Sequence, residues 1–286
     1  MNNSNEIILP DIQQTKPNIQ IPINQVGVSN VDIPFMLENK LGGYNDLIAK
    51  VSMKVSLKED KKGISMSRMI LSLKEFLRKP LKHFLIKDIL FKLQENLESD
   101  NSYISFKFKL PIIKKSPISD NEFPIYYKCV FEGQMYNNEF RFFQKIILQY
   151  LSACPCSAEL SKDLINKGFD MGFPHAQRSF AHITIEAKDP NYIWLEEIIE
   201  MVESVIKTIP YPIVKRIDEQ EIAKIASQNP LFVEDAIRLI SDKLDNCEKI
   251  HDWIVKCIHE ESIHTSEAIA INWKGIEGGF DGRYYL

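Results

Sequence analysis

Apolar and polar residues alternate along residues 44–57, where every second residue from Val51 to Leu57 is apolar. A period of two is typical of a strand with one buried face, so this stretch is predicted to be a β-strand. The apolar residues that follow Ser67 recur at helical spacing, and those of residues 86–97 do the same. Two helices are therefore expected after the first strand.

Most of the remaining chain repeats these two patterns. Further strands are predicted at residues 103–110, 126–131, 139–151, 179–187, 249–257 and 266–273. Further helices are predicted at residues 193–207, 218–227 and 231–244. The order of elements suggests a duplication, although the two halves show no visible sequence similarity. The chain is thus predicted to be an α+β protein with mainly antiparallel sheet.

The composition is that of a globular protein with one large domain or two smaller ones. The chain has 286 residues, of which 44% are hydrophobic and 26% charged. Its formal net charge of -4 argues against a nucleic-acid partner, because neutralising a phosphate backbone requires a basic surface. A phosphate ligand would have to be held by a local group of cations.

The N-terminus and the cysteines favour a cytoplasmic protein. Residues 1–14 have no basic segment followed by an apolar run, so no targeting signal is suggested. No stretch approaches the ~18 apolar residues of a membrane-spanning helix, and no membrane partner is expected. Five cysteines, an odd number, fit a reducing compartment better than a disulfide framework. Residues 1–24 contain three prolines and are expected to form an extended arm.

The densest chemical signal lies between residues 154 and 179. Cys154 and Cys156 flank a proline, and His175 follows further along the chain. Thiolate and imidazole together suit Zn²⁺ or a similar divalent ion. The alternative is that both cysteines are small buried residues at a strand end, and a Cys-x-Cys pair alone favours that interpretation.

Three further segments carry carboxylates or imidazole. Asp218 and Glu219 begin a predicted helix, where they could simply cap it. Glu234 lies at the edge of an apolar helical stripe, as a solvated carboxylate would. Glu261 and His264 share a face if their segment is a helical turn, but an ordinary surface loop has the same composition.

Several cations lie close to these segments and are candidate phosphate ligands. They are Arg68, Lys114, Lys115, Arg178, Lys215 and Arg216. Most basic residues are simply exposed to solvent on the protein surface. Arg178 and Arg68 are favoured because they lie inside the motifs described next.

Taken together, these segments resemble the type IB GTP cyclohydrolase I family. The pieces occur in the family's order as KGISMSR (62–68), LPIIKKSP (110–117), CPCS (154–157), PHAQRS (174–179), KRIDE (215–219), NPLFVED (229–235) and ESIH (261–264). Seven ordered matches are much more specific than any single one.

The resemblance implies a tunnelling fold, in which antiparallel sheets carry helix pairs packed on one face. It implies an extended arm over residues 1–40, a first tunnelling-fold unit over 41–152 and a second over 153–286. Identical chains would assemble into a barrel, as a homotetramer. The active site of such enzymes lies between units or subunits.

The family's metal ligands correspond to Cys154, His175 and Glu219, and the resemblance implies a divalent metal, Zn²⁺ or Mn²⁺, with Fe²⁺ possible. Glu261 and His264 correspond to a metal-proximal pair that would act catalytically with Cys154.

The substrate implied is GTP. Glu234 corresponds to the carboxylate that anchors guanine, because two acceptor oxygens suit the adjacent N–H and amino donors of that base. Arg178, Arg68 and Lys215 are the expected triphosphate ligands. Cys156 matches a family position whose role stays open.

The implied reaction begins with metal-activated water attacking C8 of GTP, which opens the imidazole ring. Formate leaves, and reclosure gives 7,8-dihydroneopterin triphosphate, the first intermediate of folate biosynthesis. His264 or Glu261 is the candidate proton-transfer group.

Two alternatives stay open on sequence alone. A nitrile reductase of the same fold would need a nucleophilic thiolate and no metal, and the accompanying His175, Glu219, Glu261 and His264 disfavour it. A non-catalytic purine- or pterin-binding module would keep Glu234 without turnover. Ser65 and Ala176 also stand where the family often has His and Asn, which affects fine positioning more than the reaction.

Overall fold

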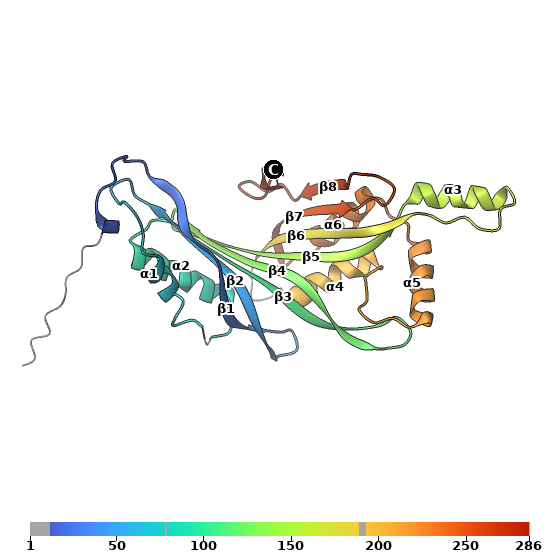
Figure 1. The fold of residues 1–286 in the computed structure, drawn as a ribbon, viewed down its shortest axis with the longest axis horizontal. Helices are drawn as coiled ribbons and strands as arrows, with labels where there is room; N and C mark the ends of the chain where they lie inside the picture. Colours follow the sequence, from blue (N-terminus) through green and yellow to red (C-terminus); the bar gives the residue numbers. More distant parts are fainter. Residues whose placement is uncertain (1–11, 78, 189–192, 286) are drawn as a thin grey trace, which may run out of the picture. The chain divides into compact units, whose positions relative to one another are not determined.

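The computed structural model describes residues 12–77, 79–188 and 193–285. The described residues form one sheet of eight strands, in which each strand from β1 to β8 is hydrogen-bonded to the next in chain order (Figure 1). The strands are β1 (Ile23–Glu38), β2 (Tyr44–Leu57), β3 (Ser102–Lys115), β4 (Glu122–Tyr136), β5 (Glu139–Ala153), β6 (Ala176–Ala187), β7 (Ile250–His259) and β8 (Ala268–Trp273). The helices are α1 (Met66–Leu71), α2 (His83–Leu97), α3 (Pro155–Asn166), α4 (Leu195–Ile206), α5 (Arg216–Gln228) and α6 (Val233–Asp245).

The predicted α+β class is confirmed, and every predicted strand and helix is present. The strand predicted at residues 44–57 has those bounds in β2. The other boundaries differ by a few residues, as at the ends of β3 and β4, where Pro111 and Pro124 interrupt the alternation. Helix α1 ends at Leu71, although the helical spacing of apolar residues continues to Leu77.

Strand β1 lies within the stretch predicted as an extended arm, and its pattern did not indicate a strand. Pro34 lies inside it, and Asn30 has a positive φ of 58°. Proline is tolerated here because β1 is an edge strand, where one side of the backbone needs no partner. Residues 1–11 of the predicted arm lie outside the described residues.

The described residues form two compact units. The first contains the residues up to 37, 48–106 and 132–141, and the second contains 38–47, 107–131 and everything from 142 on. Each of the strands β1 to β5 has residues in both units. The tandem units predicted from the family resemblance, at 41–152 and 153–286, stay a prediction.

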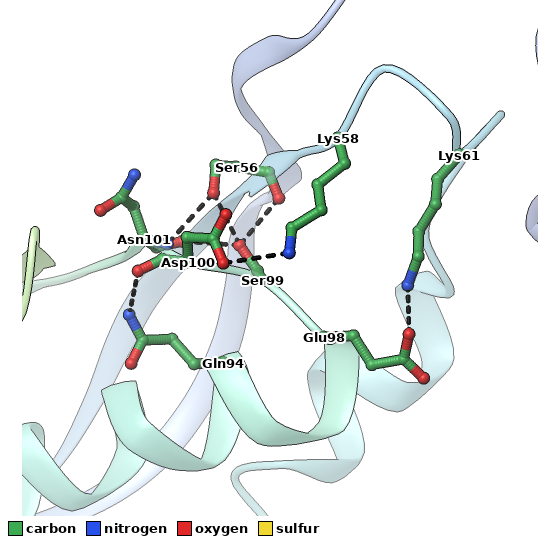
Figure 2. Close-up of polar contacts among 8 residues, drawn as sticks. All are labelled: Ser56, Lys58, Lys61, Gln94, Glu98, Ser99, Asp100 and Asn101. Atoms are coloured by element: carbon green, nitrogen blue, oxygen red, sulfur yellow. Dashed lines mark hydrogen bonds and ion pairs between the residues drawn. The ribbon is translucent and has the colours of Figure 1, made fainter.

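In the first unit, the turn after α2 is held by a polar network (Figure 2). The hydroxyl of Ser99 has the carbonyl oxygens of Ser56 and Asn101 as its two acceptors, at 2.8 and 2.9 Å from Oγ. Glu98, which ends α2 in the left-handed conformation with φ 52°, pairs with Lys61. These contacts attach the end of α2 to the end of β2, just before the segment that leads into α1.

In the second unit, α6 packs on β7 and β8 and against α4. Both helices present an apolar stripe to this core, formed by Leu195, Ile198, Ile199, Val202, Ile206, Val233, Ala236, Ile237, Ile240 and Leu244. Within the described residues, no helix is both long and apolar enough to span a membrane.

Gly133 in β4 packs closely against α2. A Cβ atom there would lie 2.4 Å from Cγ2 of Ile86 and 3.2 Å from Cδ1 of Leu90, and both side chains are fully buried. We expect Gly133→Ala to lower the free energy of unfolding by about 1–3 kcal/mol, because the core must shift to admit one methyl group.

Urea denaturation of the two proteins measures this difference. Gly63→Ala is the control, since its Cβ would make only an ordinary 3.7 Å contact with the Gln13 side chain. Equal loss of stability in both variants would contradict the close packing of α2 at Gly133.

Candidate active site

The register of strands β5, β6 and β7 brings four polar residues to one end of the sheet. Ser152 is paired with Gln177 across β5 and β6, and Ser179 is paired with His259 across β6 and β7. Side chains alternate between the two faces of a strand, so these four lie on the same face. All four are buried.

Cys154 and His175 extend this end of the sheet by one more pair. The backbone N–H of Cys154 donates to the carbonyl oxygen of His175 at 3.1 Å, directly after the last β5–β6 pair. Cys154 is also the N-cap residue of α3, and it is half-buried. The amino end of a helix favours negative charge, which suits a thiolate ligand.

The loop between α3 and β6 returns His175 to this position. Its backbone N–H donates to Oγ of Ser157 in α3 at 3.2 Å. Gly172 lies so close to α3 that a Cβ atom would be 2.2 Å from the carbonyl oxygen of Ser161, so only glycine fits. Cys156 is exposed in the first turn of the helix.

Gln177 joins His175 to Glu261. Nδ1 of His175 lies 3.1 Å from Oε1 of Gln177, and Nε2 of Gln177 donates to Oε1 of Glu261 at 3.2 Å. Nδ1 of His175 is also 3.8 Å from Oε2 of Glu261, and both side chains are largely buried. The structure therefore brings together two predicted site residues through a third that was not predicted.

A buried polar layer lies beneath this cluster. Oγ of Ser152 contacts Nε2 of Gln177 at 3.0 Å and Nδ1 of His259 at 3.3 Å. Nε2 of His259 contacts the hydroxyl of Tyr150 at 2.9 Å. Desolvation lowers the pKa of His259 to about 4, although the charge of Glu234 opposes the shift. His259 is thus a neutral, buried imidazole at neutral pH.

Glu234 is exposed in the first turn of α6, and its charge raises the pKa of His259 in this cluster. The preceding loop is fixed to the sheet, because the N–H of Leu231 donates to the carbonyl oxygen of Ala153 at 2.9 Å. The predicted guanine-binding carboxylate therefore begins a helix that starts beside Cys154.

Asp218 organises the segment that contains Lys215 and Glu219. It is completely buried and accepts hydrogen bonds from the backbone N–H of Lys215 at 2.7 Å and from both the N–H and the hydroxyl of Ser119. Burial raises its pKa, but these bonds and one from the N–H of Ile118 outweigh burial and lower it below its usual range. Asp218 therefore caps α5 and ties it to the β3–β4 turn.

Glu219 and Lys215 are exposed at the start of α5. Within the part of the chain that the structure describes, no three His, Cys, Asp or Glu side chains are arranged to hold a metal ion. Cys154, His175 and Glu219 are thus not assembled as a ligand set in one chain. Their chemistry nevertheless suits a divalent ion, since thiolate, imidazole and carboxylate are its usual donors.

The other predicted residues have different surroundings. Arg178 is exposed on β6 and alternates with the buried Gln177 and Ser179. His264 is exposed, and its N–H donates to the carbonyl oxygen of Glu261 at 3.3 Å, so both lie in one turn after β7. Arg68 is exposed on α1, in the first compact unit.

Lys114 is not available as a simple phosphate ligand. Its Nζ lies 2.6 Å from Oε2 of Glu203 in α4, and both side chains are largely buried. Tyr127 also bonds to Glu203, and burial together with this carboxylate raises the pKa of Tyr127. The cation is therefore part of a structural group beneath α4.

Comparison with known proteins gives consistent results. The chain matches the sequence profile of the family described as type I GTP cyclohydrolase folE2 over residues 9–270. It is 33% identical to the GTP cyclohydrolase FolE2 of Hydrogenovibrio crunogenus over 95% of this chain and 96% of the relative. It is 32% identical to the enzyme of the same name from Pseudothermotoga lettingae, over 94% of this chain and all of the relative.

Solved structures support the fold. The urate oxidase of Bacillus sp. TB-90 aligns with a TM-score of 0.53 at 9% identity, over 89% of this chain and all of that one. Uricase from Arthrobacter globiformis aligns with a TM-score of 0.51 at 7% identity, over 92% of this chain and 98% of that one. At this identity the likeness concerns only the fold, which is the tunnelling fold expected from the sequence.

The buried, neutral His259 predicts a pH-dependent stability. Its pKa is about 4 in the folded chain and near 6.5 when unfolded, so between these values the unfolded chain binds more protons. Stability should therefore fall as the pH is lowered, by about 2 kcal/mol between pH 6.5 and 5 from this group alone.

Urea denaturation of wild type and His259→Gln across this range measures the contribution, and the variant should lose that part of the slope. His251→Gln is the control, because His251 is exposed on the same strand. Equal slopes in wild type and His259→Gln would show that His259 is not held neutral by burial.

Proposed function

Since the chain belongs to the type I GTP cyclohydrolase folE2 family and is a GTP cyclohydrolase, we propose that the cluster around His175 and Glu261 is its catalytic centre. The enzyme opens the imidazole ring of the guanine of GTP, releases C8 as formate and yields 7,8-dihydroneopterin triphosphate. The observation that supports this location is the meeting of the ends of β5, β6 and β7 with the start of α6. That meeting gathers Cys154, His175, Glu234 and Glu261 from distant parts of the sequence.

Enzymes of this family depend on a metal ion. Cys154, His175 and Glu219 are the proposed ligands here, and Zn²⁺ or Mn²⁺, or Fe²⁺, suits this donor set. When bound, such an ion lowers the pKa of water and supplies a hydroxide nucleophile. Cys154 and His175 are neighbours across the end of the β5–β6 ladder, so two of the three donors are already held by the sheet.

A second copy of the chain is proposed to complete the site, in a homotetramer. Apolar side chains of Ile213, Val214 and Ile217 are exposed around Lys215 and Glu219, which is typical of a surface that another protein covers. Glu219 would enter the ligand set across that interface. The same assembly would bring Lys215, Arg178 and Arg68 to one triphosphate.

Glu234 is proposed to bind the guanine edge. Its two oxygens would accept hydrogen bonds from N1–H and the 2-amino group, the adjacent donors of the base. Among the residues that the structure describes, no side chain of the N-cap residue Phe232 caps α6, and the amino end of a helix favours an electron-rich ligand.

Proton transfer is assigned to Glu261 and His264, which lie in one turn. Glu261 is fixed by Gln177, while His264 is exposed to solvent. Carboxylate and imidazole are both side chains that serve as general acids and bases. A fixed carboxylate near the metal ligands and an exposed imidazole beside it suit successive proton transfers at the purine and the ribose.

Cys154→Ala is expected to abolish metal-dependent turnover, because the thiolate is the strongest proposed ligand. Formate and the fluorescence of oxidised neopterin report turnover of GTP by metal-stripped protein given Mn²⁺ or Zn²⁺, and bound metal is counted by mass spectrometry. The variant should lose formate release and most bound metal.

Cys247→Ala is the matched control, since Cys247 is also a half-buried free cysteine. Full activity in Cys154→Ala would show that Cys154 is not the metal ligand on which turnover depends. Absence of formate from the wild type with both metals would contradict the cyclohydrolase assignment itself.

Glu234→Gln is expected to reduce kcat/KM for GTP by about 100-fold, because one acceptor oxygen becomes a donor that faces the donors of guanine. Asp235→Asn should change kcat/KM little, since Asp235 pairs at 3.2 Å with Arg238 on α6. Inosine triphosphate lacks the 2-amino group, so Glu234→Gln should reduce kcat/KM for inosine triphosphate by less than it does for GTP. An equal loss with both nucleotides would show that Glu234 does not read this edge of the base.

A further inference from the structure

Gln177 uses both ends of its side-chain amide within the candidate active site. Its Nε2 donates to Oε1 of Glu261 at 3.2 Å and to Oγ of Ser152 at 3.0 Å, while its Oε1 lies 3.1 Å from Nδ1 of His175. The side chain is 5% exposed, so water offers no substitute for these partners. Its orientation therefore affects both neighbouring side chains.

Glu261 determines which way this amide points. An ionised carboxylate can only accept hydrogen bonds, so the amide must turn its NH₂ group toward Glu261. The opposite orientation would bring two oxygens to 3.2 Å of each other in a site with little solvent, which is unfavourable. The carbonyl oxygen of Gln177 consequently faces His175.

The protonation of His175 follows from this orientation. Nδ1 faces the carbonyl oxygen of Gln177 at 3.1 Å and Oε2 of Glu261 at 3.8 Å, and neither atom can donate a hydrogen. Nδ1 must therefore carry the hydrogen. The neutral ring then has its lone pair on Nε2, and among the residues that the structure describes none forms a hydrogen bond with that atom.

The layer below keeps Gln177 in place. Ser152, which accepts the second amide hydrogen, is itself held by Ser179 at 2.8 Å and by His259 at 3.3 Å. Tyr150 holds the far side of His259 at 2.9 Å. Because every residue of this hydrogen-bond network is buried, rotating the amide of Gln177 would break several hydrogen bonds at once.

We propose that Gln177 is a positioning residue that relays the charge of Glu261 to His175 and fixes His175 as the Nδ1–H tautomer, with Nε2 ready to bind a metal ion. The tautomer stands on geometry alone, and the metal-binding consequence rests on the proposed function. A histidine ligand commonly donates its second N–H to a partner that fixes the ring. Here that partner is an amide whose direction is set by a carboxylate.

The tautomer can be observed directly in metal-free protein. ¹⁵N NMR of protein labelled at its six histidines distinguishes protonated from unprotonated ring nitrogens, and loss of one signal pair in His175→Gln assigns His175. We expect the wild type to show a protonated Nδ1 and an unprotonated Nε2 at pH 8. The reverse pattern at His175 would overturn the proposal.

Gln177→Met distinguishes the effects of Gln177 and Glu261, the two acceptors that face Nδ1 of His175. The variant removes the oxygen at 3.1 Å and leaves Glu261 at 3.8 Å, so the Nδ1–H population should fall and the Nε2–H form, preferred by histidine in water, should appear. An unchanged tautomer would assign the role to Glu261 and sink the proposal. Gln149→Met is the matched control, because Gln149 lies on the opposite face of β5 from Ser152 and should leave the spectrum of His175 unchanged.

Exchanging the two groups supplies a rescue. In Gln177→Glu with Glu261→Gln, the new carboxylate accepts from Nδ1–H and from the new amide, so His175 should recover the Nδ1–H form. Recovery would not be expected if Gln177 merely filled space. Failure of the double variant to restore the tautomer, where Gln177→Met has lost it, would contradict the relay.

Metal affinity provides a readout that needs no GTP. Titration of metal-stripped protein with Mn²⁺ or Zn²⁺ should show about 10–100-fold weaker binding for Gln177→Met than for wild type or Gln149→Met. Equal affinity would show that the tautomer does not prepare His175 for a metal. An inactive wild type with the Nδ1–H tautomer would instead refute the proposed function and leave the positioning role intact.

Discussion

Strand β6 pairs with β5 on one side and with β7 on the other, and the register of these two pairings decides where the chemistry of the protein lies. It sets Gln177 opposite Ser152 and Ser179 opposite His259. Because side chains alternate at every residue, a slip of one position would move all of β6 to the wrong face. Antiparallel pairing also brings the last residues of β5, the first residues of β6 and the last residues of β7 to the same end of the sheet. Cys154 directly follows β5, His175 directly precedes β6, and Glu261 lies two residues after the end of β7.

The strands and helices were largely readable from the sequence, because apolar residues at periods of two and 3.6 report which face is buried. β1 was the exception, since Pro34, Gly27 and Asn30 conceal its alternation. An edge strand buries less and can hold such residues. The family and its reaction also followed from sequence, through seven motifs that occur in the family's order.

The partners of the predicted site residues could not be read in the same way. Gln177 lies inside a recognised motif, but an amide has no distinctive chemistry until its neighbours are known. His259 and Tyr150 look like ordinary members of two strands, and only the pairing of β6 with β7 and β5 connects them. Asp218 was interpreted from sequence as a possible helix cap, and that is how it functions, with the β3–β4 turn as a second attachment.

The buried polar layer lowers the stability of the protein at low pH, and its position beneath Gln177 explains why it is buried. Oε1 of Glu261 lies 4.0 Å from Nδ1 of His259, and the charge of Glu234 raises the pKa of this ring, yet desolvation outweighs Glu234 and keeps the imidazole neutral. A neutral ring can accept on one side and donate on the other, whereas a charged ring can only donate. Neutral His259 can therefore continue the hydrogen-bond chain between Tyr150 and Ser152, and that chain keeps Gln177 fixed. Burial, which makes the layer unfavourable for stability at low pH, is the same property that gives the amide above it a single direction.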